Sequence, residues 1–201
     1  RLNQLARADR LLAISEFSRD EAMLTLSLGA HRVINISAAV APSFLSPNGR
    51  EQAEPNFKSS LRDWGVRDEF VLYVPGGFDA RKNFERLFAA YGQLPEGLRQ
   101  RYQLVITGKL DKGRADLLMS YARAAGLTAD DIVLVGYVTD KRLRDLYGHA
   151  ALFVFPSLHE GFGLPVLEAM TCDAPVIAAN TSSLPEVVGS PSALFDPYDP
   201  L

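Results

Sequence analysis

The stretch PSLHEGFGLPVLEAM, which runs from Pro156 to Met170, decides the fold. An apolar segment over 152–155 precedes it, and Gly161 and Gly163 mark a turn. An apolar helical pattern follows, with Pro165 in its first turn, where a missing backbone N–H costs nothing. A strand, a glycine turn and a helix N-terminus in this order can bind an anion.

Two carboxylates frame this turn. Glu160 lies on the turn itself and Glu168 lies about one turn into the following helix, so both can reach a ligand that rests on the glycines. An ionised carboxylate accepts hydrogen bonds and donates none, which suits the hydroxyl groups of a sugar or a ribose. For either glutamate alone, a solvated side chain beside an ordinary turn is the alternative.

Short apolar runs alternate with amphipathic segments along most of the chain. The runs lack polar alternation, as is typical of strands that are covered on both faces, and they lie at 70–74, 104–107, 132–135, 152–155 and 176–178. Helices are predicted over 83–93, 114–125, 141–147, 164–171 and about 183–188. We therefore predict an α/β fold with a Rossmann-like, doubly wound parallel sheet. Ligands should bind beyond the carboxyl ends of its strands, at a switch in strand order.

The first part of the chain, 1–46, reads as the end of another domain. It contains an apolar stretch over 8–14, a helical pattern from Ser15 to about Gly29, and a short strand over 33–36. The polar segment 47–60 contains proline and glycine and predicts an interdomain linker, after which 61–201 form the second domain, truncated at its end. Because the first residue is Arg and not Met, we expect a fragment.

Composition and charge exclude several classes of function. A formal net charge of −3 with scattered basic residues gives no support to nucleic-acid or membrane binding. No apolar run approaches the roughly 18–20 residues that span a bilayer. The single cysteine, Cys172, fits a reducing and hence cytoplasmic compartment, and it is interpreted as a small buried apolar residue. No metal-site spacing of His and Cys is present.

The loop 75–83 follows a predicted strand and has the residues of a phosphate site. Gly76 and Gly77 let the backbone approach a ligand closely, and Lys82 offers a compact cation for phosphate oxygens. The spacing of a P-loop is missing. A helix N-terminus disfavours a cation, so a lysine kept there suits a strongly negative ligand. A solvated lysine at a helix start is the alternative.

Two further loops follow strands and therefore face the same edge of the sheet. Gly108 and Lys109 form one of them, either as ligand contacts or as an ordinary loop. In the other, Thr139 is the expected N-cap of the next helix. His159, beside Glu160, is interpreted as lining the site, with a catalytic role as the alternative.

The segment HEGFGLPVLEAM resembles the E-x7-E signature of the retaining glycosyltransferases of family 4, which have the GT-B fold. Other stretches agree with the family in the same order: ADRLLAISEFSRDE, YVPGGFDARKNFERLFAAY, LVITGK, IVLVGYVTDKRLRDLY and APVIAANTSSLPEVVG. The resemblance covers nearly the whole chain. It implies that 61–201 are the C-terminal, donor-binding domain and that 1–46 close the N-terminal, acceptor-binding domain.

The resemblance also implies a role for each contact. Lys82 would bind the diphosphate of the donor and take part in catalysis with Glu160, which would bind hydroxyls of the transferred sugar. Glu168 would bind the ribose, and the backbone around Val138 would contact the nucleobase. The glycine turn would hold the diphosphate through Gly161, Phe162, Gly163 and Leu164.

The chain departs from the family at one phosphate contact. Many members carry Gly-Arg where this chain has Gly76-Gly77, and the arginine binds phosphate. Arg81 or Lys109 could take its place, and the sequence leaves both open.

The implied function is transfer of a hexose, with retention, from a UDP-sugar or GDP-sugar to a glycan or lipid-linked acceptor in bacterial polysaccharide synthesis. No cofactor is expected, and because the chain has no D-x-D pair, no metal either. The acceptor would bind to the missing part of the N-terminal domain, so we expect the chain alone to be inactive. The alternatives are a non-catalytic nucleotide-sugar-binding module and a nucleotide-sugar epimerase or phosphorylase of similar fold.

Overall fold

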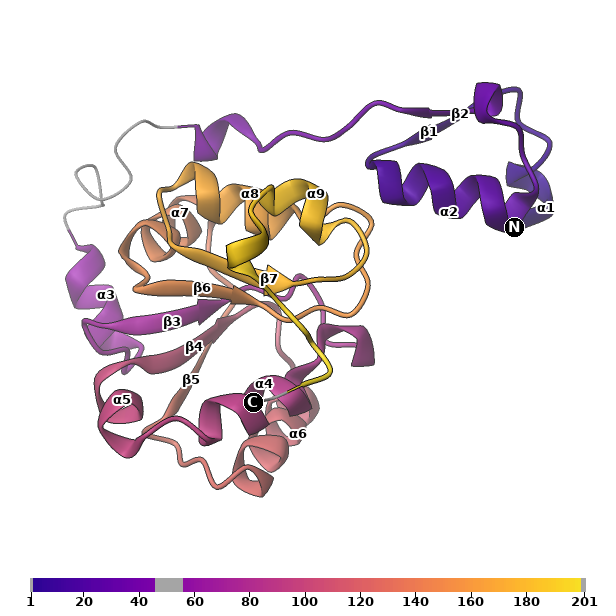
Figure 1. Ribbon diagram of the computed structural model, residues 1–201. Helices are drawn as coiled ribbons and strands as arrows, with labels where there is room; N and C mark the ends of the chain where they lie inside the picture. Colours follow the sequence, from indigo (N-terminus) through magenta and orange to yellow (C-terminus); the bar gives the residue numbers. More distant parts are fainter. Residues whose placement is uncertain (1, 46–55, 200–201) are drawn as a thin grey trace.

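The computed structural model describes residues 2–45 and 56–199 and places them in two parts (Figure 1). Residues 2–36 form a small unit around a two-stranded sheet, and 56–199 form a larger unit around a six-stranded sheet. Residues 37–45 lead from the small unit to the larger one, and the short 3₁₀ helix Pro42–Phe44 packs against its core. The predicted linker 47–60 lies largely outside the described residues. Its last four positions, 57–60, belong to a helix, α3 (Phe57–Asp63), and the Phe57 side chain is buried.

The six-stranded sheet is parallel throughout, as the apolar runs predict. Its strands are β3 (Phe70–Tyr73), β4 (Gln103–Thr107), β5 (Ile132–Gly136), β6 (Leu152–Phe155), β7 (Val176–Ala179) and β8 (Leu194–Phe195), in the spatial order β5-β4-β3-β6-β7-β8. Within this sheet the chain enters at β3 in the middle, continues outward through β4 to β5, returns to β6 on the other side of β3, and continues outward to β8. The strand order therefore switches between β3 and β6, which pair at Val71 and Leu152.

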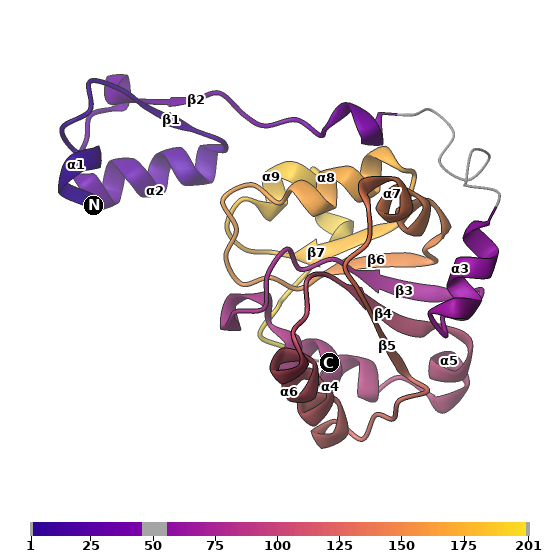
Figure 2. The ribbon, with the colours of Figure 1, turned by 180° about the vertical axis from the view of Figure 1, so that it is seen from behind.

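Helices cover both faces of this sheet. They are α4 (Phe84–Gly92), α5 (Glu96–Arg101), α6 (Lys112–Ala124), α7 (Asp140–His149), α8 (Leu164–Thr171) and α9 (Leu184–Val188). Figures 1 and 2 show α7, α8 and α9 on one face and α4 and α6 on the other. The predicted doubly wound α/β fold is thereby confirmed.

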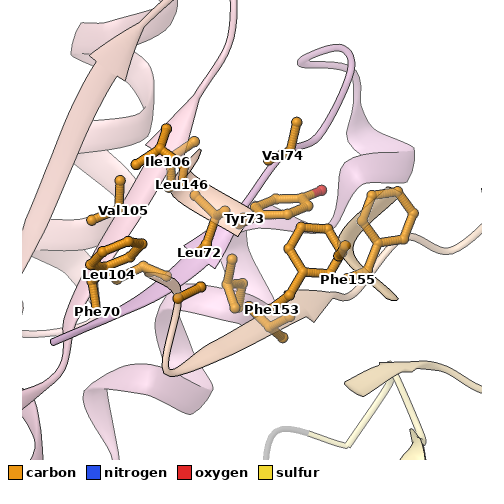
Figure 3. Close-up of a cluster of buried hydrophobic side chains, with 14 of the residues drawn as sticks. Phe70, Leu72, Tyr73, Val74, Leu104, Val105, Ile106, Leu146, Phe153 and Phe155 are labelled. Carbon is orange, nitrogen blue, oxygen red and sulfur yellow. The ribbon is translucent and has the colours of Figure 1, made fainter. Parts of the chain in front are cut away.

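The core of the larger unit consists of the strands and the helix faces packed on them. Figure 3 shows Phe70 of β3 next to Leu104 of β4, with Phe153 and Phe155 of β6 on the other side of Leu72, and these side chains are fully buried. Burying one such side chain stabilises the fold by about 1.5–3 kcal/mol. Since the centre of the sheet is closely packed, the loops that leave β3 and β6 start from fixed positions.

The smaller unit contains α1 (Leu2–Leu5), β1 (Leu11–Ala13), α2 (Glu16–Leu26) and β2 (Val33–Asn35), and β1 pairs with β2 in parallel. Ser15, where the sequence predicts that a helix starts, caps α2 by accepting a hydrogen bond from the N–H of Ser18. None of the residues of α2 is fully buried, and large apolar side chains of the strands and their ends are exposed: Leu12, Ile14, Ile34 and Ile36.

Candidate functional site

The loops that follow β3 and β6 meet at the switch in strand order. Because the two strands are adjacent and parallel, their carboxyl ends lie at the same edge of the sheet. The backbone N–H of Leu158 donates to the carbonyl oxygen of Arg81 at 2.8 Å. Asn83, in the left-handed conformation with φ 58°, donates from its side-chain amide to the carbonyl of Pro156 at 3.1 Å. This crevice is where ligands bind in doubly wound folds.

Lys82 and Glu160 form an ion pair across these two loops. The Lys82 ammonium lies 2.5 Å from Glu160 Oε1, and the side chains are only 9% and 15% exposed. Lys82 Nζ also lies 5.8 Å from the centroid of the Phe155 ring. An ammonium has three protons to donate. Lys82 can therefore bind a phosphate oxygen without first leaving Glu160.

Two hydroxyl groups fix this ion pair. Ser157, fully buried, donates to Glu160 Oε1 at 2.5 Å. Tyr73 at the end of β3 donates to the carbonyl oxygen of Lys82 at 2.7 Å. Burial, together with the charges of Glu160 and Asp79, raises the pKa of Tyr73 well above its ordinary value, so the phenol stays a donor.

The glycine turn after Glu160 is held by the segment before α9. The Ser182 hydroxyl accepts a hydrogen bond from the backbone N–H of Glu160 at 3.0 Å. Ser183 donates to the carbonyls of Glu160 and Phe162 at 3.0 and 2.8 Å. Gly163 has φ 103°, and a Cβ there would lie 2.7 Å from a methyl group of Leu184. The turn therefore requires glycine at 163 and the serine pair that follows β7.

The N-terminus of α8 begins directly after this turn. Gly163 supplies no side-chain cap, and Pro165 lies in the first turn as predicted. The first N–H groups of a helix have no partner within the helix, so they are available to an anion, together with the positive end of the helix dipole. Phe162 and Leu164, which flank Gly163, belong to this same segment.

Glu168 lies on α8, half-buried, and accepts a hydrogen bond from the Tyr147 hydroxyl at 2.9 Å. Burial raises the pKa of the Glu168 carboxyl above its ordinary value. The hydrogen bond from Tyr147 acts against this rise, and the charge of Asp140 adds to it. The Tyr147 hydroxyl therefore stabilises the charge of Glu168, whereas a cation, Lys82, stabilises the charge of Glu160.

A cavity of about 440 Å³ opens beyond β3, β4 and β5. It is lined by Val74, Gly76, Gly77, Phe78, Thr107, Gly108, Lys109, Arg114, Tyr137, Val138, Asp140 and Leu143. The predicted contacts Gly76, Gly77, Lys109 and Val138 are all among them. A Cβ on Gly77 would lie 3.8 Å from the Cε atom of Lys82, so the cavity adjoins the ion pair.

The structure distinguishes the two cations that the sequence left open. Lys109 lines the cavity, with its ammonium 5.2 Å from the centroid of the Tyr137 ring. Arg81 does not line it, and its guanidinium lies 2.9 Å from Asp79 on the exposed surface. Arg114, a cavity residue that sequence reasoning missed, is a second cation there. Its only signal in the sequence is its place in the first turn of the helix after β4.

The smaller unit contacts the glycine turn through the start of α2. The hydroxyls of Ser15 and Ser18 both donate to the carbonyl oxygen of Gly161, at 2.6 and 2.8 Å. Glu186 on α9 accepts the backbone N–H of Glu16 at 3.0 Å. A carboxylate at a helix N-terminus is favourable. Gly161 is thus held by its carbonyl and does not line the cavity.

His159 faces the smaller unit, not the cavity. Its ring lies edge-on to Phe17, with centroids 5.4 Å apart, and its Nε2 lies 2.9 Å from a carboxylate oxygen of Glu21. Both partners belong to α2. Its contacts support a role in holding the two units together.

Two local sequence predictions are confirmed, the N-cap at Thr139 and the burial of Cys172. Thr139 caps α7, and burial raises the pKa of the Cys172 thiol to about 11.

Within 2–45 and 56–199, no cluster of three or more His, Cys, Asp or Glu residues could hold a metal ion. In the same ranges, no helix combines the length and the apolar character needed to cross a membrane.

Comparisons with known proteins place this site in a family. The profile of the family Glycosyl transferases group 1 matches residues 58–200, and the chain belongs to this family. The serotype-specific mannosyltransferase WbdA of Escherichia coli is 38% identical over 99% of this chain and 24% of its own length. The O-antigen chain mannosyltransferase B of Escherichia coli is 36% identical over 97% of this chain and 49% of its own length. The chain therefore spans about a quarter of the length of the first relative and about half of the second.

Solved structures agree on the fold. The Anabaena protein HepE, solved with UDP and glucose, superposes with a TM-score of 0.80 at 21% identity and covers 99% of this chain and 52% of its own. A glycosyltransferase from Rickettsia africae gives a TM-score of 0.78 at 17% identity, over 96% of this chain and 50% of its own. The larger unit is thus the Rossmann-like C-terminal half of a GT-B fold.

Proposed function

We propose that the protein transfers a sugar from a nucleoside diphosphate sugar to an acceptor hydroxyl, in the synthesis of a bacterial polysaccharide, and that residues 56–199 hold the donor. The Lys82–Glu160 ion pair, at the switch in strand order and beside the cavity, carries the proposal. It brings a phosphate-binding cation and a hydroxyl-binding carboxylate to one point, as a sugar bonded to a diphosphate requires.

The rest of the donor has a place on either side of this pair. The nucleobase occupies the cavity against Val138, and the ribose binds to Glu168, which senses the charge of the cavity residue Asp140. The diphosphate lies between Lys82, Lys109 and the N-terminus of α8. Lys109 replaces the family's second phosphate arginine, since it lines the cavity and Arg81 does not.

The chemistry follows from the charge that develops during transfer. When the bond between sugar and phosphate breaks, negative charge grows on the leaving nucleoside diphosphate. Lys82 and the N–H groups of Phe162, Gly163 and Leu164 stabilise that charge from fixed positions. Glu160 accepts hydrogen bonds from hydroxyls of the transferred sugar and stabilises its positive, oxocarbenium-like character. Retention of configuration and independence of metal ions are part of the proposal.

The names of the relatives make mannose the first sugar to test. WbdA and the O-antigen chain mannosyltransferase B are both named for mannosyl transfer, and each matches nearly the whole of this chain. HepE, solved with UDP-glucose, supports a nucleotide-sugar donor through its fold alone.

The proposal is tested by titrating the chain with GDP, UDP and the corresponding nucleosides in a calorimeter. We expect one diphosphate to bind, and Lys82→Ala to weaken it about tenfold or more, because charged partners are worth about 1.5–3 kcal/mol. Nucleoside binding should not change. The control is Lys58→Ala, which removes an exposed lysine from α3, at the opposite end of the strands. No binding of either diphosphate, or equal weakening of diphosphate and nucleoside by Lys82→Ala, contradicts the proposal.

A further inference from the structure

Tyr147 is a fully buried polar residue whose role the sequence does not indicate. It lies in the last turns of α7, and its side chain has no exposed surface. A buried hydroxyl without a partner is costly, so such groups are retained where they make a hydrogen bond. The Tyr147 hydroxyl donates to Glu168 Oε2, which is 21 positions away on α8.

Two aromatic rings hold the ring of Tyr147 from different elements. Phe153 of β6 lies edge-on to it, with centroids 5.4 Å apart. Phe44 lies edge-on at 6.1 Å and belongs to a short 3₁₀ helix, Pro42–Phe44, which precedes the larger unit. Phe44 is itself 3% exposed. The direction in which the phenol donates is therefore fixed by a strand of the sheet and by the segment that leads into it.

In the part of the chain that the structure describes, the Tyr147 hydroxyl is the donor to the Glu168 carboxylate. The groups that act on its carboxyl are Tyr147 and Asp140 from α7, and the thiol of Cys172, the residue after α8, lies close enough to be affected by its charge. Asp140 repels a second negative charge, and the thiol stays neutral because burial raises its pKa to about 11. Among these groups, only Tyr147 stabilises the ionised form of Glu168.

We infer that Tyr147 is a positioning residue for nucleotide binding: it holds Glu168 Oε2 so that the other carboxylate oxygen is free to accept the ribose hydroxyls. The inference rests on the proposed function, since it concerns the same site. Phe44 contributes by keeping the phenol in place. Tyr147 itself does not touch the ligand.

The test compares a nucleoside diphosphate with its 2′,3′-dideoxy form, which lacks the hydroxyls that Glu168 would bind. Calorimetric titration of the chain should show tighter binding of the ribose form. In Tyr147→Phe the ratio of the two dissociation constants should fall by about fivefold, because one hydrogen bond to Glu168 is lost. Binding of the dideoxy form should not change. Tyr91→Phe is the matched control, because the buried Tyr91 hydroxyl donates to the carbonyl of Tyr102 at 2.6 Å and not to a site residue.

The outcomes separate the inference from the proposed function. If the ribose form is preferred and Tyr147→Phe retains the full preference, the inference is overturned and the proposed function stands. If the wild-type chain binds both forms equally, Glu168 has no ribose partner, and the inference falls while donor binding remains. If no nucleotide binds, both fail.

A second variant and a pH profile keep the test decisive should Tyr147→Phe not fold. Phe44→Leu leaves the hydroxyl in place and loosens the ring, so the preference for ribose should fall by a smaller factor. In either variant, a weaker hydrogen bond lets the pKa of Glu168 rise further. The carboxylate is then protonated at a higher pH. When the pH is lowered, the variant should therefore lose its preference for the ribose form at a higher pH than the wild type does. A purely structural defect would weaken binding equally at every pH, and that result overturns the inference.

Discussion

The Glu160 turn and the Glu168 helix belong to one short stretch of sequence, yet their surroundings differ. Glu160 is paired with a cation from the loop after β3 and with a buried serine. Glu168 has a phenol from α7 and a nearby like charge, Asp140. The signature sets the spacing of the two carboxylates. The strand order sets their partners, because it brings the β3 loop beside the first and α7 beside the second.

The two glutamates therefore show two ways of stabilising a carboxylate in a partly buried site. The ion pair of Glu160 supplies a cation that can also serve a phosphate. The hydroxyl next to Glu168 supplies direction and leaves the carboxylate its full negative charge. A site that must bind both a diphosphate and neutral hydroxyl groups needs both arrangements.

The largest expected effect is on stability, at the ion pair. Lys82→Ala leaves the Glu160 carboxylate with little solvent and no cation, and it should lower the free energy of unfolding by about 3 kcal/mol. The double variant Lys82→Met with Glu160→Gln should recover most of this loss, because no unpaired charge is left. Urea unfolding followed by circular dichroism measures both. A loss in Lys82→Ala within the error of the method would show that the pair is solvated.

A smaller effect is expected at the serine beside the pair. Ser157→Ala removes a hydroxyl that donates to Glu160 Oε1, and hydrogen bonds to charged groups are worth about 1.5–3 kcal/mol. We expect a loss near the lower value in the same unfolding experiment. Ser120→Ala on α6 is the control, since its exposed hydroxyl donates to the Leu117 carbonyl of its own helix. Equal losses in the two variants would remove Ser157 from the account.

Most strands and helices of the larger unit could be predicted from the sequence, because their buried residues form continuous apolar runs or helical patterns. The apolar run at 152–155 coincides with β6, and the helical pattern at 164–171 coincides with α8. The sequence missed α5, which has no buried residue, and β8, which is two residues long. Such elements have too little periodicity to be distinguished from loops.

The site could be predicted as far as it depends on position along the chain. Gly76, Gly77, Lys109 and Val138 follow strands, and the fold brings them to one cavity. Ser157, Ser183 and Tyr147 were missed because their partners are set by tertiary geometry. A serine after a strand looks the same in sequence whether its hydroxyl meets Glu160 or water.

The smallest effect concerns the pH dependence of stability at Glu168. The folded-state pKa of this carboxyl is raised above its ordinary value of 4.5 by burial, so the folded state binds more protons there than the unfolded state. The wild type therefore loses stability relative to Glu168→Gln as the pH rises from below 4.5 through the folded-state pKa, and the difference is constant above it. Urea midpoints of both proteins across this range measure the trend. A difference that moves in the opposite direction would mean that a cation stabilises Glu168.

The division of labour between the two glutamates is tested most directly by one calorimetric experiment. Glu160→Gln and Glu168→Gln are each titrated with the sugar-free nucleoside diphosphate that the wild type binds. We predict that Glu168→Gln weakens binding by about fivefold or more, through the lost ribose contact. Glu160→Gln should bind as tightly as the wild type, because the proposed partner of Glu160 is the sugar, which this ligand lacks. If both variants weaken binding alike, or if Glu160→Gln alone does so, the two carboxylates do not divide the donor between them.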